Sequence, residues 1–295
     1  MTIRRALILI VAVLVTACGG GSSSSSSPST PTSPSSPAPT STTVRYAALG
    51  ASDANGVGSS APCVPFTACE NGAGYVPSLA RLLRTGREVT LVNLGIPAAV
   101  LSPTIYELGR RYGREIPANF IERELPFVPG DSTLITVLGG PNDVNALGDA
   151  VSQGAAGNDL KGYLDAQIRA FGSDYDRLVQ GLRSRAPNAT VILINVPNMA
   201  GLPYSAGYPL QARQVLQYIS VGFSREVNRQ GGSRVLIADA MCDAQIYASS
   251  GFASDGFHPN DSGHSYLAQR LLSIVNTGVG GAASSCGQMT LVPAL

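Results

Sequence analysis

Lysine is almost absent from this chain of 295 residues: of its 20 basic residues, only Lys161 is not an arginine. The basic residues are nearly balanced by 19 acidic ones, and no cluster of basic side chains marks one segment. Proteins that bind nucleic acid concentrate positive charge on one face to neutralise phosphates. The composition therefore argues against a nucleic-acid partner or another polyanionic one.

Histidine is also scarce, and the pattern of cysteines does not suit a metal site. The only two histidines, His258 and His264, lie in the segment "DGFHPNDSGH", and no C-x-x-C motif occurs. Zinc sites usually draw on such paired cysteines and histidines. We therefore expect no metal and no other cofactor.

The N-terminus contains an apolar run that is too short to span a bilayer. Arg4 and Arg5 precede the run from Ala6 to Val15, an arrangement typical of a signal peptide. The run ends in Val15-Thr16-Ala17-Cys18, which resembles the lipobox of bacterial lipoproteins. This resemblance implies lipidation of Cys18, export, and anchoring of the protein to the bacterial cell envelope; a plain secretory signal is the alternative.

Large apolar and charged residues are missing from the next segment. Residues 19–43 read "GGGSSSSSSPSTPTSPSSPAPTSTT", and such a segment cannot bury enough surface to fold. We therefore predict a signal peptide at 1–17, a lipidated cysteine with a disordered linker at 18–43, and one catalytic domain at 44–295. No second tract of this kind divides the domain, and we expect it to be monomeric.

Four cysteines remain in the domain, which is an even number. In an exported protein this favours disulfide bonds. Proximity in the sequence suggests Cys63 with Cys69, which leaves Cys242 for Cys286, although sequence alone allows three pairings.

The domain alternates buried strands with amphipathic helices. Helical spacing is clearest in Leu164, Ile168, Phe171, Tyr175, Leu178 and Leu182, and it recurs from Leu216 to Val227 and from Leu267 to Ile274. Five apolar runs predict strands: 44–49, 89–94, 132–138, 190–196 and 234–238. The alternation predicts an α/β fold of the flavodoxin-like type, with three layers and a central parallel sheet of five strands. Ligands bind such sheets beyond the carboxyl ends of the strands.

Residues suited to catalysis follow four of these strands. Ser52 follows the first strand, Gly95 the second and Asn142 the third, where Asp143 could cap the next helix. Each alone is as easily explained as a turn residue.

After the fifth strand come Asp255 and His258 in the order D-x-x-H. Pro259 disfavours helical backbone at His258 and keeps it in a loop. Asp255, three residues earlier, can curl back toward the imidazole of His258. For His264, at the start of the last helix, a packing or capping role is the better interpretation.

Together these segments resemble the SGNH (GDSL-type) hydrolase family over essentially all of residues 44–295. The resemblance rests on four blocks: Gly50-Ala51-Ser52-Asp53, Gly95, Gly140-Pro141-Asn142-Asp143 and Asp255-Gly256-Phe257-His258. The block around the serine departs from the usual Gly-Asp-Ser, because Ala51 replaces the aspartate.

The resemblance implies a serine esterase or lipase that cleaves carboxylic esters through an acyl-enzyme. Ser52 would be the nucleophile, His258 the base and Asp255 its orienting partner. The oxyanion would be bound by the N–H groups of Ser52 and Gly95 and by the amide of Asn142. The substrate would be a small-molecule, lipid or carbohydrate ester.

Two alternatives remain open at this stage, and a third lacks the motif that it requires. A carbohydrate acetyl esterase would share the fold, and a surface-anchored binding module would share it without activity. An α/β-hydrolase would need a G-x-S-x-G motif, and none occurs in the chain.

Overall fold

The computed structural model describes residues 43–295. The predicted signal peptide, Cys18 and all but the last residue of the predicted linker lie outside the described residues, so their assignment stays a prediction. In residues 43–295, no helix is both long and apolar enough to cross a membrane.

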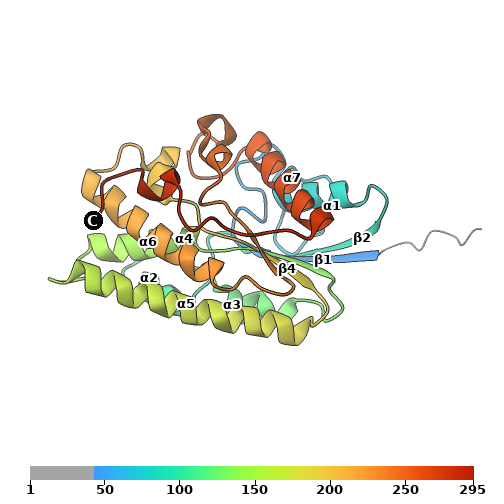
Figure 1. Ribbon diagram of the computed structural model, residues 1–295, viewed down its shortest axis with the longest axis horizontal. Helices are drawn as coiled ribbons and strands as arrows, with labels where there is room; N and C mark the ends of the chain where they lie inside the picture. The colour runs from blue at the N-terminus through green and yellow to red at the C-terminus, as the bar shows by residue number, and fades with distance from the viewer. Residues whose placement is uncertain (1–42) are drawn as a thin grey trace, which may run out of the picture. The chain divides into compact units, whose positions relative to one another are not determined.

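The centre of the fold is a sheet of five parallel strands, as predicted (Figure 1). The strands are β1 (Thr43–Gly50), β2 (Glu88–Asn93), β3 (Leu134–Leu138), β4 (Thr190–Ile194) and β5 (Val235–Ala238), and each begins and ends within two residues of the expected apolar run. Their order is β2-β1-β3-β4-β5. The connections that follow β1 and β3 therefore lead to opposite sides of the sheet, which creates a crevice at the carboxyl ends of these two strands.

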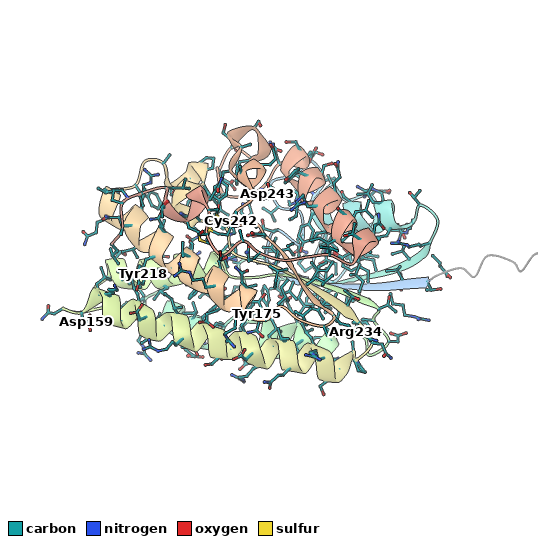
Figure 2. All side chains as sticks on the ribbon, in the orientation of Figure 1. Asp159, Tyr175, Tyr218, Arg234, Cys242 and Asp243 are labelled. Atoms are coloured by element: carbon teal, nitrogen blue, oxygen red, sulfur yellow. A yellow bond between two sulfur atoms is a disulfide. The ribbon has the colours of Figure 1, made fainter. Side chains whose placement is uncertain are left out.

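Helices cover both faces of the sheet, which gives the expected three layers (Figure 1). The helices are α1 (Tyr75–Leu83), α2 (Pro103–Arg111), α3 (Phe120–Arg123), α4 (Pro141–Ser152), α5 (Leu160–Arg185), α6 (Leu210–Asn228) and α7 (Asp261–Thr277). α1 and α7 pack on one face, and the others pack on the opposite face. The long helix α5 begins after Asp159, whose carboxylate accepts the Gly162 N–H at 2.9 Å (Figure 2).

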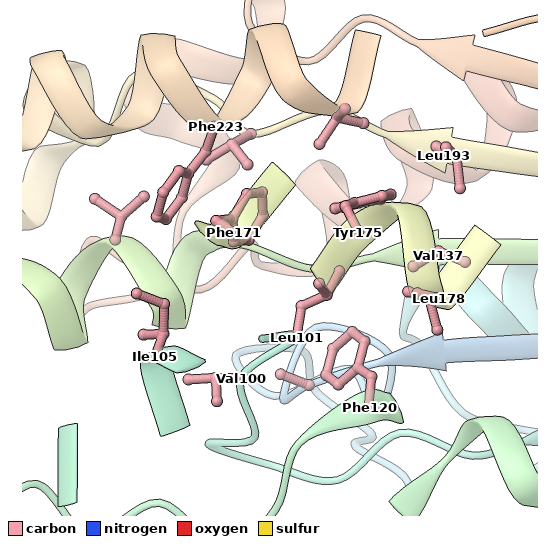
Figure 3. Packing of buried hydrophobic residues seen from close by; sticks show 14 of the residues in the cluster. Val100, Leu101, Ile105, Phe120, Val137, Phe171, Tyr175, Leu178, Leu193 and Phe223 are labelled. Carbon is pink, nitrogen blue, oxygen red and sulfur yellow. The ribbon is translucent and has the colours of Figure 1, made fainter. Parts of the chain in front are cut away.

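The larger part of the core lies between the sheet and the helices α5 and α6. Phe171, Tyr175 and Leu178 of α5 are fully buried, as their helical spacing predicts (Figure 3). The rings of Phe171 and Phe223, from α5 and α6, are stacked with centroids 3.8 Å apart. Burying side chains of this size contributes about 1.5–3 kcal/mol each, which fixes the helices that border the crevice.

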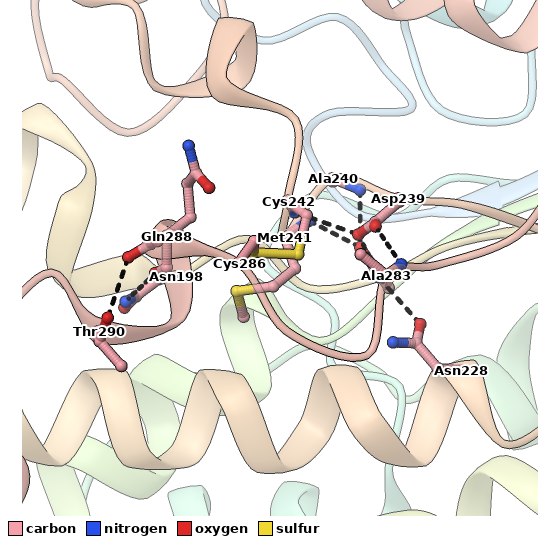
Figure 4. Close-up of a disulfide and its surroundings, with 12 residues drawn as sticks. Asn198, Asn228, Asp239, Ala240, Met241, Cys242, Ala283, Cys286, Gln288 and Thr290 are labelled. Atoms are coloured by element: carbon pink, nitrogen blue, oxygen red, sulfur yellow. Dashed lines mark hydrogen bonds between the residues drawn. A yellow bond between two sulfur atoms is a disulfide. The ribbon is translucent and has the colours of Figure 1, made fainter.

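Both expected disulfides are present in the structure. Cys63 is bonded to Cys69 within one loop, and Cys242 is bonded to Cys286 across 44 positions of sequence. Asp239 reinforces the second bond, since its carboxylate accepts the N–H groups of Cys242 and Ala283 (Figure 4). The C-terminal segment is thereby held beside the end of β5.

Candidate active site

Ser52 lies at the switch point of the sheet, where the chain turns after β1. The turn is made by backbone bonds from the Ala54 N–H to the Ala51 carbonyl and from the Val57 N–H to the Ser52 carbonyl. The Ser52 N–H has no acceptor paired with it within residues 43–295. Ser52 therefore presents both its hydroxyl and an unpaired N–H at the crevice.

Ser52, His258 and Asp255 form a continuous chain of hydrogen bonds. The Ser52 Oγ lies 2.8 Å from Nε2 of His258, and Nδ1 of His258 lies 2.6 Å from Oδ2 of Asp255. Ser52 and His258 are separated by 206 positions in the sequence, so the fold creates this contact. The geometry is that of a nucleophile, a base and an orienting carboxylate.

The loop that carries His258 is shaped by Asp255 and Gly256. Oδ1 of Asp255 accepts the N–H groups of Phe257 and His258 at 2.9 and 3.0 Å, while its other oxygen bonds the ring. Gly256 has a φ of +68°, and a Cβ there would lie 2.7 Å from the Tyr204 nitrogen. The aspartate and the glycine of D-G-F-H are thus both needed to aim the imidazole.

The charge of Asp255 is favoured by these same hydrogen bonds. Burial raises the pKa of the carboxyl, but the side chain and backbone of His258 and the N–H of Phe257 outweigh it, so the pKa lies below its usual value. Asp255 is therefore ionised near neutral pH. Its charge stabilises an imidazolium at His258.

A glycine permits the two halves of the site to approach each other. Gly58 has a φ of +91°, and a Cβ there would lie 2.5 Å from the Pro259 carbonyl oxygen and 2.8 Å from the Cβ of His258. Only glycine fits between the serine turn and the histidine loop. The sequence shows this glycine in "GVG", but nothing in the sequence alone reveals its contact with residues 200 positions away.

Asn142 lies in the first turn of α4 and lines the same cleft as Ser52 and His258. Its side-chain nitrogen donates to the Ala99 carbonyl oxygen at 2.9 Å. An amide carries two N–H groups, so one remains for a ligand. The structure brings Asn142 to the cleft together with the serine and the histidine.

Gly95 packs tightly against the serine turn. A Cβ at Gly95 would lie 2.7 Å from the Cβ of Ala54. The amide of Asn55 joins the two segments, since its nitrogen lies 3.0 Å from the Gly95 carbonyl oxygen and 3.1 Å from that of Ala51 in the orientation that pairs donor with acceptor. The Gly95 N–H donates to Oδ1 of Asn93 at 3.2 Å, and Gly95 does not line the cleft. Gly95 is therefore adjacent to the site, with its N–H engaged inside the loop.

The prediction that Asp143 caps α4 is wrong. Gly140 precedes the helix with a φ of +116°, and no side chain caps it. The two carboxyl oxygens of Asp143 instead accept the N–H groups of Leu101 and Ser102, both at 2.9 Å. Burial raises the pKa of Asp143 to about 7, against the opposing effect of these N–H groups. Asp143 fixes the loop between β2 and α2, on which Gly95 and Ala99 lie.

The cleft around Ser52 has a volume of about 880 Å³. Residues of α4 and α6 form its walls, including Gly148, Val151, Val215 and Leu216. Its rim is more polar and aromatic, with Tyr204, Tyr208, Asn145 and the ion pair of Arg114 and Asp149. The cleft can therefore hold a substrate with both apolar and hydrogen-bonding parts.

His264 is fully buried in α7 and does not touch Ser52. Its Nδ1 accepts the Tyr75 N–H at 3.3 Å, and its Nε2 donates to the Val57 carbonyl oxygen at 3.2 Å. Burial lowers the pKa of the ring, although the nearby carboxylate of Asp53 opposes this. A neutral His264 thus links α7 to α1 and to the serine turn, which matches the packing role expected for it.

Glu124 was not found by sequence reasoning. It ends α3, outside the four blocks, yet its fully buried carboxyl accepts the Gly50 N–H at 2.9 Å, two residues before the serine. The Gly50 carbonyl in turn accepts the Ile96 N–H at 3.0 Å. Burial raises the pKa of Glu124 well above its usual value, against the N–H groups of Gly50 and Ile96. A single carboxyl group thus lies beneath the junction of the serine and Gly95 loops.

Within residues 43–295, no group of three or more histidine, cysteine or acidic side chains is placed to bind a metal ion.

Comparison with known proteins identifies relatives of the same architecture. The model of the GDSL-like lipase/acylhydrolase family matches residues 48–266. No curated protein matches the chain. Among solved structures, the lipase Lip_vut3 from a goat rumen metagenome is 16% identical, with 80% of this chain and 98% of that chain covered and a TM-score of 0.52.

Two further solved structures are similar. A protein described as a GDSL-like lipase from Parabacteroides merdae is 17% identical, with 81% and 97% of the two chains covered and a TM-score of 0.50. A carbohydrate esterase of family 3 from Talaromyces cellulolyticus is 15% identical, with 79% and 97% covered and a TM-score of 0.47. At such identities, the likeness to the two lipases establishes the fold and leaves the substrate open.

Proposed function

Since the chain belongs to the GDSL-like lipase/acylhydrolase family, we propose that it is a serine hydrolase that cleaves carboxylic esters through an acyl-enzyme on Ser52. The family and its lipase and esterase neighbours support ester hydrolysis in general. The hydrogen-bonded chain from Ser52 through His258 to Asp255 supports the serine mechanism in particular, and this is the observation that carries the proposal.

The first step is attack of the Ser52 Oγ on the ester carbonyl. Nε2 of His258, 2.8 Å away, takes the hydroxyl proton as the bond to carbon forms. The ring becomes an imidazolium, which Asp255 stabilises through Nδ1. The imidazolium then returns the proton to the departing alcohol, and Ser52 is left acylated.

The negative charge that develops on the carbonyl oxygen requires hydrogen-bond donors. The free N–H of Ser52 and the second N–H of the Asn142 amide both belong to residues that line the cleft. Gly95 would contribute a third donor if its N–H exchanged the 3.2 Å bond to Asn93 for the oxyanion. Bonds of this length in an unliganded site often rearrange when substrate binds.

The second step is hydrolysis of the acyl-enzyme. A water molecule that enters from the open cleft loses a proton to Nε2 of His258 and attacks the acyl carbon. The proton then returns to the Ser52 oxygen as the carboxylic acid leaves. No redox group or metal is needed for the atoms and charges to balance.

The experiment is a comparison of three alanine variants with a short p-nitrophenyl ester. Ser52→Ala and His258→Ala should each reduce kcat by about 10³-fold or more, because each removes a member of the chain that transfers the proton. His264→Ala is the matched control, because the same side chain is removed from the same segment of sequence. It should stay within a few-fold of the unaltered enzyme at a temperature where all variants are folded.

An active-site label separates the enzyme from an inactive binding module. A fluorophosphonate should modify the unaltered protein at Ser52, and peptide mapping should find the label there. Undiminished turnover in Ser52→Ala, or a label that survives this substitution, would show that another residue is the nucleophile.

A further inference from the structure

A second cavity lies beside the cleft, on the far side of the histidine loop. It has a volume of about 270 Å³ and lies over the ends of β3 and β4, where Leu138 and Asn195 line it. Phe257 lines both this cavity and the cleft, whereas Ser52, Asn142 and His258 line only the cleft. The cavity is therefore not used by the proposed reaction.

Asp53 gives this cavity an unusual chemical character. The side chain lines the cavity, is only 8% exposed, and makes no hydrogen bond to another side chain or to the backbone of a residue elsewhere in 43–295. Burial raises the pKa of this carboxyl, although the nearby histidines oppose the effect. The hydrogen bond that this carboxyl accepts comes from its own backbone N–H, so burying its charge is costly unless a ligand of opposite charge compensates it.

No positively charged side chain among the described residues that line the cavity compensates the charge of Asp53. Neither lysine, arginine nor histidine occurs among the described residues that line it. His264 lies nearby, but its Nδ1 accepts a hydrogen bond from Tyr75 and its Nε2 donates to Val57. The ring is therefore neutral, and both of its nitrogens are engaged with other residues.

The remaining walls are mostly apolar and aromatic, with the polar side chains of Asn195 and Gln245 among them. Phe252, Phe257 and Tyr266 contribute three aromatic rings, and Met199 and Leu267 add aliphatic surface. Aromatic rings attract cations through their negative faces and also accept methyl groups. Exposed Ser250 and Ser262 lie at the outer edge of the cavity, which gives a path to the solvent.

We propose that this cavity binds a small alkylammonium cation, with the Asp53 carboxylate as its counter-ion and the aromatic side chains around its methyl groups. An anion would be repelled by Asp53, and an apolar ligand would leave the carboxyl unpaired. A divalent metal would require several oxygen ligands, whereas Asp53 is the only carboxylate that lines the cavity. One water molecule takes up roughly 30 Å³ in the liquid, so a cavity of about 270 Å³ has room for a small cation such as choline.

The test compares choline with its uncharged carbon analogue, 3,3-dimethylbutan-1-ol, by isothermal titration calorimetry on the intact protein. The two molecules have nearly the same shape and differ in charge. Choline should bind with a Kd on the order of 1 mM, and the analogue should bind at least about tenfold more weakly. Equal affinities, or no saturable binding of choline up to about 100 mM, would overturn the proposal.

Three variants locate the site. Asp53→Asn should weaken choline binding by about tenfold or more, and it should fold because asparagine has the same shape without the buried charge. Phe252→Leu should weaken binding by a few-fold, since it keeps an apolar wall and removes one ring. Asp149→Asn is the matched control, because it removes a carboxylate from the cleft instead, and it should leave choline binding unchanged.

Each outcome of the variants is decisive. Unaltered binding in Asp53→Asn would refute the second site, and loss of binding in Asp149→Asn would place the cation in the cleft instead. Because these titrations use no ester, they stay informative even if Ser52 proves not to be the nucleophile.

Discussion

Glu124 offers the sharpest test of how the site is held in shape. Replacing it with leucine, which has a similar volume, leaves the Gly50 N–H buried and without an acceptor. An unsatisfied buried N–H costs about 1–3 kcal/mol. For a domain of this size, about 2–4 °C is lost per kcal/mol, so the Tm of Glu124→Leu should fall by about 2–12 °C.

The effect on catalysis follows from the position of Gly50. It lies two residues before Ser52, and its carbonyl is bonded to Ile96, the residue after Gly95. A shift of this junction would move the serine and its N–H relative to His258, and displacements of about 1 Å can cost about 10²-fold in rate. We therefore expect kcat for a p-nitrophenyl ester to fall by roughly 10- to 100-fold, with little change in KM.

Two companion variants distinguish positioning from simple destabilisation. Glu124→Gln resembles the protonated acid that the raised pKa favours, keeps an acceptor for Gly50, and should retain kcat within about threefold. Leu182→Ala empties a buried position near the end of α5 and should cost about 2–5 kcal/mol without a comparable change in kcat below its Tm. A positioning role for Glu124 would be contradicted if Glu124→Leu lowered Tm without lowering kcat, or if Glu124→Gln had a kcat as low as that of Glu124→Leu.

Two further predictions concern stability. From loop-closure entropy, the Cys242–Cys286 bond, which spans 44 positions, stabilises the fold by about 4 kcal/mol, and the Cys63–Cys69 bond, which spans 6, by about 2 kcal/mol. Replacing both cysteines of a pair with serine should lower the Tm measured by calorimetry by about 8–16 °C for the first bond and by about 4–8 °C for the second. A larger loss for the second bond would contradict this prediction. Burial lowers the pKa of His264 below 6.5 in the folded protein. As the pH falls, His264 is therefore protonated in the unfolded chain before it is protonated in the folded one. The contribution of His264 to stability is therefore complete above about pH 6.5 and is lost as the pH falls through the lower folded pKa. Urea unfolding at pH 7.5 and 5.5 should show a smaller pH dependence in His264→Gln, and equal slopes would contradict this.

The sequence predicted the architecture well because periodicity and burial are local signals. The apolar runs located every strand within two residues, and the spacing in α5 identified the buried side chains Phe171 and Tyr175. The four blocks identified the residues that the structure gathers at the cleft, Ser52, His258 and Asn142. These predictions depend on patterns that a short segment carries by itself.

The sequence was less informative where a contact joins distant segments. Glu124 has no motif around it, and only the folded chain shows its bond to Gly50. Asp143 was expected to cap the helix that follows the third strand, but its carboxylate accepts two N–H groups of a neighbouring loop instead. The engaged N–H of Gly95 likewise depends on the side chain of Asn93 and on the exact path of a loop.

The missing side chain at Gly58 has a consequence for how activity could be lost. A single methyl group there would strike the backbone and Cβ of the histidine loop, although Ser52, His258 and Asp255 themselves would be unchanged. Replacing this one glycine, which carries no reactive group, would therefore separate His258 from Ser52 without altering either residue. A sequence that keeps all the residues of the four blocks can thus lose activity through a change at a position outside them.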